Sequence, residues 1–380
     1  MDRRGFLAGL AAGVALVRSG AAVGARTVSV VATERHRLRL VELARGLEHP
    51  WALAFLPDGR LLVTERPGRL RLLEPPDLRP SPPLPGVPEV WARGQGGLLD
   101  VALDPDFARN RLVYLSYAAA GADGRAGTRV GRGVLDGGRL RDFAPVFVAN
   151  ARTTTARHFG CRLLFDRAGR LFATLGDRGH RALAQDLASH AGKVVRLWPD
   201  GSVPADNPFV DRRDAAPEIY TYGHRNPQGM ALEPGTGEVW IHEHGPQGGD
   251  EVNVLLPGAN YGWPVITHGR EYGTGAPIGE GTRRPDVVDP LRVWIPSIAP
   301  SGMAFYDGPL FPAWRGDLLV GALRARTLVR LPRRGRTLVG EERMLTGTIG
   351  RIRDVRVGLD GAVYLLTDHR DGGLYRLEPV

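Results

Sequence analysis

Apolar and polar residues alternate in short runs along most of this chain, and turns rich in Asp, Gly and Pro separate the runs. Residues 53–65 show the pattern clearly, because the runs LAFL and LLVTE flank the turn PDGR. Alternation with a period of two predicts half-buried β-strands, and a tight Asp-Gly turn between two runs predicts a hairpin. Five further segments follow this pattern: residues 101–117, 163–177, 230–243, 311–323 and 355–368. The pattern is weakest in residues 311–323.

The six hairpins recur about every fifty residues, which is the spacing of propeller blades. We therefore predict an all-β fold, a six-bladed β-propeller. No clean linker divides the chain, so we expect a single domain over residues 26–380. The strong final strand could close the ring with a first strand near residues 38–43. A β-sandwich or a pair of barrels is the alternative.

The segments between the hairpins are rich in Gly, Pro and polar residues, and we expect them to gather as loops on one face of the propeller. Helical periodicity is almost absent, and only residues 182–191 could form a short helix. The longest expected loops are residues 120–133, 199–214 and 268–285.

The first 25 residues read as an export signal. Arg3 and Arg4 precede an apolar run from Phe6 to Val17, and small residues follow up to Ala25. This order is typical of a secretory leader, and the paired arginines favour the twin-arginine route. We expect cleavage after Ala25 and a periplasmic or secreted protein, with a buried helix or a membrane anchor as the alternative. No later stretch is long and apolar enough to span a membrane, so we expect no stable membrane insertion.

Composition narrows the possible partners. The formal charge is +9, or about +7 without the leader. The arginines are spread along the chain, without a basic stripe that carries interleaved aromatic residues, so we expect no nucleic-acid binding.

Cys161 is the only cysteine, which excludes an intrachain disulfide. Lys193 is the only lysine among the 50 basic residues, so an arginine can stand where relatives carry lysine.

Two short polar segments precede predicted strands and carry candidate chemistry. His158 lies in RHFG, where a neutral imidazole at a loop end suits a general base, although it could simply hydrogen-bond a turn. Arg225 and Asn226 lie in GHRNPQG. Their guanidinium and amide groups can bind carboxylate or quinone oxygens, and the glycines let a flat ligand approach the backbone.

Further cations and carboxylates follow. Arg351 and Arg353 alternate along the chain and therefore project from one face, as a ligand with several carboxylates would require. Arg324, just after another predicted strand, could join them; a solvated edge is the alternative. Residues 243–251 (EHGPQGGDE) combine glycines with carboxylates, which suits calcium as well as it suits a plain acidic turn. No third ligand at a suitable spacing accompanies the two nearby histidines, so zinc is not expected.

Several motifs in this order resemble the soluble glucose/aldose sugar dehydrogenases that depend on pyrroloquinoline quinone (PQQ), and the loops are closest to the aldose-type branch. The resemblance covers about residues 49–368. It implies a six-bladed propeller that holds PQQ over the central channel together with calcium and oxidises the C1 hydroxyl of aldose sugars to lactones. The motifs are GQGGLLDVALDPDF, RHFGCRLLFD, GHRNPQGMA, HGPQGGDEVNVLLPGANYGWP, IAPSGMAFY and RIRDV.

The resemblance also implies roles for single residues. His158 matches the catalytic base, which takes the C1 hydroxyl proton while hydride passes to the quinone C5, and Arg225 matches the residue beside the C5 oxygen. Gly245 and Pro246 match carbonyl ligands of the catalytic calcium, and Glu251 and Tyr261 match a calcium site of the aldose-type members. The residues that match cofactor contacts, with Tyr272 lining the cofactor or sugar pocket, are Gln95, Arg225, Asn226, Tyr272, Arg324, Arg351 and Arg353.

Two positions depart from the family pattern. Cys161 stands where relatives usually carry Gly, and we interpret it as a packed small side chain rather than a reactive thiol. Arg157 replaces an acid found beside the base in some glucose-oxidising members. The sequence thus predicts an aldose dehydrogenase that passes electrons to an external acceptor, and we favour a monomer. A calcium-dependent lactonase or a non-catalytic binding propeller is the alternative.

Overall fold

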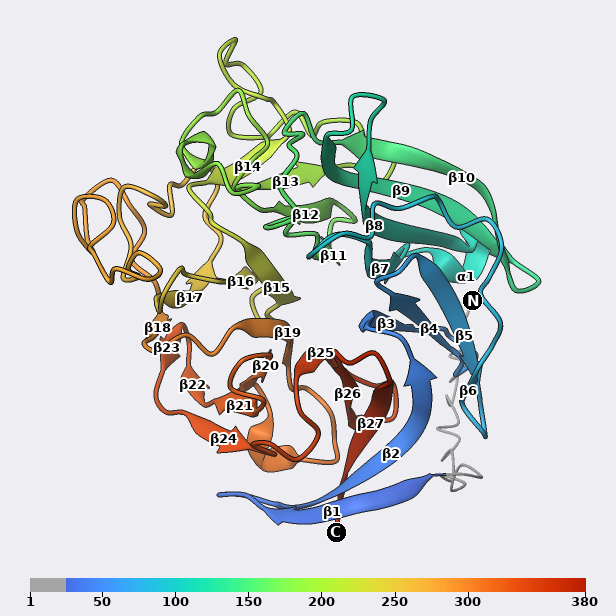
Figure 1. Cartoon of the computed structure of the whole chain (residues 1–380). Helices are drawn as coiled ribbons and strands as arrows, with labels where there is room; N and C mark the ends of the chain where they lie inside the picture. Colours follow the sequence, from blue (N-terminus) through green and yellow to red (C-terminus); the bar gives the residue numbers. More distant parts are fainter. Residues whose placement is uncertain (1–24) are drawn as a thin grey trace, which may run out of the picture.

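Six sheets stand around a common axis like the blades of a propeller (Figure 1). The computed structural model describes residues 25–380, so the predicted leader, apart from Ala25, lies outside the described residues. Within that range the chain is almost entirely β-structure. The prediction of an all-β, six-bladed β-propeller is confirmed, and the alternative of a sandwich or paired barrels is wrong.

The blades follow one another along the chain, and each begins with its innermost strand. The first contains β3 (Pro50–Phe55), β4 (Leu61–Glu65), β5 (Arg69–Glu74) and β6 (Arg79–Pro80). The second contains β7 (Leu98–Leu103), β8 (Leu112–Ala120), β9 (Ala126–Asp136) and β10 (Arg139–Val148). The third contains β11 (Leu163–Phe165), β12 (Leu171–Leu175), β13 (Lys193–Leu197) and β14 (Ile219–Tyr222).

The remaining blades include the strand that closes the ring. The fourth contains β15 (Pro227–Leu232), β16 (Val239–Glu243), β17 (Asp250–Val254) and β18 (Arg292–Trp294). The fifth contains β19 (Pro300–Phe305), β20 (Leu318–Ala322), β21 (Leu328–Leu331) and β24 (Glu342–Met344), with a small hairpin of β22 (Arg333–Arg334) and β23 (Thr337–Leu338) beside it. The sixth contains β25 (Ile352–Val357), β26 (Val363–Thr367), β27 (Gly372–Pro379), β2 (Arg37–Leu47) and β1 (Arg26–Ala32).

The two ends of the described chain close the ring within the sixth blade. β2 pairs antiparallel with β27, for example Leu40 opposite Leu377, and β1 adds an outer strand (Figure 1). Leu38 and Leu40 are fully buried, so the closing strand belongs to the core. The predicted closure near residues 38–43 is confirmed, with β2 longer than expected.

Three local predictions need correction. In the fifth blade, residues 311–323 hold only one ladder strand, β20; the innermost strand is β19, and the 3₁₀ turn η2 (Pro312–Trp314) lies between them. Pro and Gly in PSGMAF interrupt the alternation of β19, which is why the pattern missed it. The expected helix at residues 182–191 is a single 3₁₀ turn, η1 (Arg181–Ala184), and the one α-helical turn is α1 (Phe107–Asn110) within residues 25–380.

The expected loop at residues 120–133 is instead a hairpin whose second strand, β9, begins at Ala126. Gly131 faces the ring of Phe143, and a Cβ atom at this position would lie 2.5 Å from it. The glycines of β9 therefore permit close packing rather than flexibility. The expected loops at residues 199–214 and 268–285 are present and contain no ladder strand.

The innermost strands share a local irregularity that aims side chains at the axis. Five of them, all except β11, carry a register shift against the second strand of their blade near their first residues. A bulge of this kind bends a strand and re-aims its side chains. Hydroxyl groups on second strands then link neighbouring blades, as when Thr64 donates to the Leu99 carbonyl at 2.5 Å and Ser116 donates to the Cys161 carbonyl at 2.6 Å.

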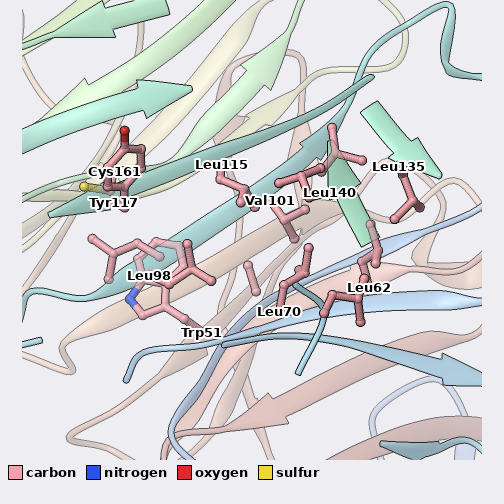
Figure 2. Packing of buried hydrophobic residues seen from close by; sticks show 14 of the residues in the cluster. Trp51, Leu62, Leu70, Leu98, Val101, Leu115, Tyr117, Leu135, Leu140 and Cys161 are labelled. Atoms are coloured by element: carbon pink, nitrogen blue, oxygen red, sulfur yellow. The ribbon is translucent and has the colours of Figure 1, made fainter. Parts of the chain in front are cut away.

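Apolar layers between adjacent blades form the core. Figure 2 shows the layer between the first two blades, where Trp51, Leu62 and Leu70 pack with Leu98 and Leu115. Cys161 closes this layer toward the third blade and is fully buried. Burial raises the pKa of its thiol to about 12. Its backbone φ of 83° is a conformation that favours glycine, and the side chain is packed, as the sequence suggested.

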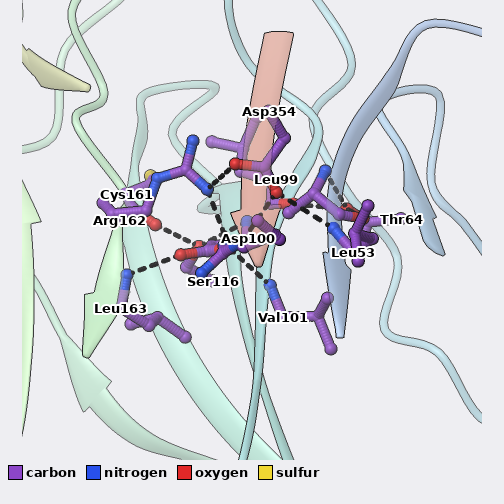
Figure 3. Close-up of polar contacts among 12 residues, drawn as sticks. Leu53, Thr64, Leu99, Asp100, Val101, Ser116, Cys161, Arg162, Leu163 and Asp354 are labelled. Atoms are coloured by element: carbon purple, nitrogen blue, oxygen red, sulfur yellow. Dashed lines mark hydrogen bonds and ion pairs between the residues drawn. The ribbon is translucent and has the colours of Figure 1, made fainter. Parts of the chain in front are cut away.

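A buried ionic cluster joins blades across the axis (Figure 3). Arg162, at the entrance to β11, donates from one terminal nitrogen to Asp100 at 3.2 Å and to Asp354 at 3.1 Å. Asp354 also accepts the backbone N–H of Leu53 at 3.2 Å. Arg356 binds the same two carboxylates at 3.0 and 2.9 Å. Four blades are thereby tied to one centre beneath the cavity described next, and we call these four charged residues the hub.

Candidate active site

A cavity of about 340 Å³ opens on the axis, above the hub. Its wall is built where innermost strands begin and second strands end, so every blade contributes to it. The lining residues are Trp51, Arg66, Gly94, Gln95, Leu99, Phe159, Gly160, Asn226, Gln228, His244, Ala299, Leu323, Arg351, Arg353 and Asp368.

His158 stands beside this cavity in a strained turn before β11, with a backbone φ of 56°. Its Nδ1 lies 2.7 Å from Asp177 Oδ1. Asp177 also accepts the Gly179 backbone N–H at 2.7 Å and the Trp263 indole N–H at 2.8 Å. A carboxylate at Nδ1 holds the ring proton there, which leaves Nε2 as a proton acceptor. The arrangement is a buried His–Asp pair fixed by a third group, as general bases require.

The electrostatics of this pair favour a neutral imidazole. Burial lowers the pKa of His158; the Asp177 carboxylate opposes the shift, and the charges of Arg225 and Arg157 add to it. Burial alone would raise the pKa of Asp177, but hydrogen bonds from His158, Gly179 and Trp263 outweigh burial and hold that pKa below its usual value. Asp177 is therefore ionised, and His158 is ready to accept a proton at neutral pH.

Arg225 and Asn226 reach the same region from the loop before β15. The Arg225 guanidinium lies 5.4 Å from the centre of the Trp263 ring. It donates to the carbonyls of His244 and Gly245 at 3.1 and 2.7 Å. Asn226 lines the cavity and accepts the Gly160 backbone N–H at 3.1 Å. A guanidinium and an amide thus stand on the side of the cavity that carries His158.

Arginines from the sixth blade occupy the opposite wall. Arg351 and Arg353 bind the same oxygen of Asp368, at 3.2 and 3.0 Å, so they do project from one side as predicted. Burial alone would raise the pKa of Asp368, but Arg353, the His49 hydrogen bond and Arg351 hold that pKa well below its usual value. The buried Arg353 Nε has no partner among residues 25–380. An anionic ligand in the cavity would supply one.

Gln95 links the cavity to His158, because its side-chain oxygen accepts the His158 backbone N–H at 2.7 Å. Three predicted contacts do not line the cavity. Arg225 lines the small neighbouring pocket at Gly245 instead. Arg324 is exposed next to the lining residue Leu323. Tyr272 is 63% exposed and donates to the Pro246 carbonyl at 2.8 Å, so it stands over the calcium candidates rather than in the cavity wall.

The residues proposed for calcium are close together, but their oxygen atoms are partly engaged. A small pocket brings Gly245, Glu251 and Tyr261 together with Arg225 and Glu243. Burial and the Glu243 carboxylate raise the pKa of Glu251 well above its usual value. The Tyr261 hydroxyl donates to the Val254 carbonyl and accepts the Leu256 backbone N–H. Tyr261 would therefore bind calcium through its backbone carbonyl.

The Gly245 carbonyl accepts a hydrogen bond from Arg225, and the Pro246 carbonyl accepts one from Tyr272. Among residues 25–380, no three His, Cys, Asp or Glu side chains form a metal site. The donor set that remains, carbonyls with one carboxylate, is of the hard-oxygen type that calcium accepts. The residues therefore fit a calcium ion, provided that Arg225 gives up its bond to the Gly245 carbonyl.

Sequence reasoning missed the acids that hold these groups, although the pattern contains a signal for them. Four of the predicted hairpins end in an acid: Glu65, Asp177, Glu243 and Asp368. Each acid forms a hydrogen bond with a residue just before, or at the start of, the innermost strand of its own blade. Glu65 binds Glu48, Asp177 binds His158, Glu243 binds Arg225 and Asp368 binds Arg353. An acid at the end of a second strand is thus a recurrent anchor for the site loops. No comparable sequence pattern indicated the contact between Trp263 and Asp177.

Comparisons with known proteins show the family to which the chain belongs. A family model described as Glucose / Sorbosone dehydrogenase matches residues 47–376. The chain is 47% identical over 337 residues to the Aldose sugar dehydrogenase YliI of Escherichia coli (strain K12), covering 88% of this chain and 91% of that protein. It is 28% identical over 406 residues to the Quinoprotein glucose dehydrogenase B of Acinetobacter calcoaceticus, covering 85% of this chain and 84% of that protein.

Solved structures give the same result. The soluble aldose sugar dehydrogenase of Escherichia coli in its apo-form superposes with a TM-score of 0.88 at 45% identity, covering 90% of this chain and 100% of that one. The PQQ-bound form of the aldose sugar dehydrogenase from Streptomyces coelicolor superposes with a TM-score of 0.73 at 30% identity, covering 92% of this chain and 98% of that one. No helix within residues 25–380 is long and apolar enough to cross a membrane.

Proposed function

Because this chain belongs to the glucose/sorbosone dehydrogenase family and is a sugar dehydrogenase, we propose that it oxidises the C1 hydroxyl of aldoses to lactones with PQQ and calcium. The observation that carries the proposal is the His158–Asp177 pair, whose Nε2 has no hydrogen-bond partner among residues 25–380, next to a cavity lined by Asn226, Arg351 and Arg353. Arg225 lines the small pocket beside this cavity. The aldose and an external electron acceptor are the partners that the relatives imply.

His158 is the proposed base. Its Nε2 takes the proton of the C1 hydroxyl, and Asp177 keeps the ring in the required tautomer and stabilises the imidazolium that forms. Arg225 places a positive charge where negative charge develops in the transition state. Phe159 and Leu99 line the cavity and exclude water from part of it, which strengthens these interactions.

The residues of the cavity fit PQQ. When bound, PQQ supplies the hydride acceptor, and calcium supplies Lewis acidity. Arg351 and Arg353 would bind carboxylates of PQQ, with the unpartnered Arg353 Nε among the donors. Asn226 and Gln95 would add amide contacts, and Arg324 and Tyr272 would join only if they turn inward. Gly245, Pro246, Glu251 and Tyr261 would hold calcium. The volume of about 340 Å³ is within the usual range of ligand sites.

We further propose that residues 1–25 direct export by the twin-arginine route and that residues 26–380 work as one domain in the periplasm or outside the cell. The motif Arg-Arg-Gly-Phe-Leu and the apolar run after it support this proposal. Size-exclusion chromatography of the exported chain would test the expectation of a monomer.

Dye reduction by the purified chain with glucose, with and without added PQQ and calcium, tests the proposed function. We expect turnover only when both are added, together with an absorbance change when PQQ binds. A panel of aldoses that gives no turnover, in a chain that does not bind PQQ, would contradict the proposal. Hydrolysis of lactones by the same preparation would then favour the lactonase alternative.

A further inference from the structure

The mouth of the cavity is surrounded by arginines without an acidic partner. All six are exposed or partly exposed, and none forms an ion pair with an Asp or Glu among residues 25–380. We call them the arginine rim: Arg66, Arg93, Arg157, Arg324, Arg326 and Arg370.

The rim residues are tied to the cavity by position. Arg66 lines it, Arg93 precedes Gly94 and Gln95, and Arg157 precedes His158 and Phe159. Arg324 follows the lining residue Leu323, and Arg326 lies in the same turn between β20 and β21. Arg370 lies in the turn between β26 and β27, two residues after Asp368. All six therefore lie on the face where the cavity opens.

Three carboxylates near this mouth are already paired with cations, whereas Asp371, beside Arg370, is exposed and lies 4.0 Å from Arg45. Asp368 binds Arg351, Arg353 and His49. Glu48 binds Arg69, and Glu271 binds Arg181 through both carboxylate oxygens, at 2.5 and 3.2 Å. The rim consequently leaves a net positive charge around the opening, and charges arranged around a cleft steer ligands of opposite sign toward it.

We propose that the arginine rim is the docking surface for the electron acceptor and that this acceptor is a redox protein with an acidic face. The inference rests on the proposed function, since an aldose that becomes a lactone releases two electrons and two protons. The electrons pass through the mouth, one to each of two acceptor molecules, and the protons go to solvent. The rim spans turns of three blades and two of the segments between blades, which is wider than a small anion requires.

The magnitude of the effect follows from screening. The Debye length falls from about 30 Å in 0.01 M salt to about 8 Å in 0.15 M salt, so exposed charges act across the rim only in dilute salt. Electrostatic steering raises association rates by about 10-fold to 1,000-fold under such conditions. The rim therefore predicts fast capture of an acidic acceptor in dilute salt and the loss of that advantage as salt is added.

The test uses the PQQ- and calcium-loaded enzyme, reduced by glucose, with two c-type cytochromes of matched reduction potential, one acidic and one basic. Stopped-flow absorbance gives the second-order rate constant for each. In about 0.01 M salt we expect the acidic cytochrome to be reduced at least about 10-fold faster, and the difference to vanish at about 0.15 M salt. A basic cytochrome that reacts as fast, or rates that do not respond to salt, would overturn the proposal.

Two arginines outside the proposed cofactor contacts make suitable variants. Arg93→Gln with Arg370→Gln should slow reduction of the acidic cytochrome several-fold in dilute salt and leave reduction of an uncharged dye unchanged. Arg139→Gln is the matched control, because this exposed arginine also lacks an acidic partner among the described residues but begins β10 at a turn on the opposite face. Equal losses in the control and the double variant would contradict a specific rim.

A binding measurement separates failure of the rim from failure of the proposed function. Calorimetry of the acidic cytochrome with the enzyme in the absence of sugar should give salt-dependent binding that the double variant weakens, whatever the turnover. If no aldose leads to reduction of the uncharged dye, the proposed function fails. The calorimetric binding of the acidic cytochrome still tests whether the arginine rim is a docking surface. Rapid reduction of hexacyanoferrate(III) without cytochrome binding would show that small anions are the acceptors, and the protein partner would be excluded.

Discussion

At the scale of single residues, the chemistry of the site is set by which atoms the neighbours of His158 leave free. Asp177 binds Nδ1, Gln95 accepts the backbone N–H, and Nε2 has no hydrogen-bond partner within the described chain. Trp263 and Gly179 in turn fix Asp177. The tautomer and orientation of the proposed base are therefore consequences of residues that the proposed reaction does not touch.

Replacing Asp177 with Asn should lower kcat by about 10²-fold to 10⁴-fold, because an amide no longer selects the tautomer with a free Nε2. PQQ affinity, measured by absorbance titration, should change little, because Asp177 does not line the cavity. Trp263→Phe is the milder comparison, since it removes one hydrogen bond to Asp177 and keeps the carboxylate. A kcat within threefold of the wild type in Asp177→Asn would contradict the role of this pair.

The pH dependence of kcat/KM should report the depressed pKa of His158. A base works only when neutral, so activity is present above its pKa and is lost as the pH falls through that value. Burial lowers the pKa of His158, which places this acidic limb below the ordinary histidine value of about 6.5. Asp177→Asn removes a carboxylate that raises the pKa, so its residual activity should show a limb at still lower pH. A limb above the ordinary value would refute this electrostatic account.

At the scale of elements, strands β1 and β2 differ in what they contribute although both join the sixth blade. β2 pairs with β27 and buries Leu38, Leu40 and Leu47 completely, whereas all residues of β1 remain partly or fully exposed. The closing strand thus belongs to the core and the outer strand to the surface. The alternation in residues 38–43 sufficed to predict this closure, because one buried face of a strand leaves its mark on the sequence.

Truncation should separate these two strands. A chain that starts after β1 should fold with a loss of unfolding free energy of about 1–2 kcal/mol, since an edge strand with an exposed face is removed. A chain that also lacks β2 should not give a cooperative transition, because the ring is open and the partner edge of β27 is exposed. Thermal unfolding followed by circular dichroism measures both. Similar transitions in the two truncated chains would contradict the closing role of β2.

At the scale of the whole molecule, the hub joins blades that lie far apart along the sequence. Arg162 reaches Asp100 and Asp354, which are 62 and 192 residues away. Its guanidinium also lies 4.3 Å from the centre of the Trp51 ring. Its Nε donates to the Gln228 carbonyl in the fourth blade at 3.1 Å. One side chain therefore contacts five blades directly beneath the cavity.

Arg162→Met should lower the free energy of unfolding by about 3–5 kcal/mol, because it leaves two buried carboxylates with less compensation. Arg356→Met is the control, since Arg356 binds the same carboxylates but its side chain is 25% exposed, and it should cost less. Urea unfolding followed by tryptophan fluorescence gives both values. Equal losses, or a loss below about 1 kcal/mol for Arg162→Met, would contradict a structural hub.

The sequence predicted the groups that face the cavity better than the groups that support them. His158, Asn226, Arg351 and Arg353 lie in motifs with local spacing, and they meet because the strands of a propeller begin around one axis. Asp177 is 86 residues from Trp263, and their contact exists only once the third and fourth blades are adjacent.

The same limit applies to predicted contacts outside the strands. Arg324 and Tyr272 were assigned to the cofactor by resemblance, but both are exposed outside the cavity wall. The conformation of a loop rich in Gly and Pro depends on distant partners, such as the Pro246 carbonyl that holds Tyr272. Strand periodicity predicted the six blades. It did not predict β19, the innermost strand of the fifth blade, because Pro and Gly interrupt its alternation.

The most direct test of the central claim is the rate at which glucose reduces enzyme-bound PQQ in wild type and in His158→Ala, measured by stopped-flow absorbance at neutral pH. We predict that His158→Ala binds PQQ with an affinity within about twofold of the wild type and is reduced about 10²-fold to 10⁴-fold more slowly, since only the proton acceptor is lost. Reduction at the wild-type rate in this variant would show that His158 is not the base and would contradict the account.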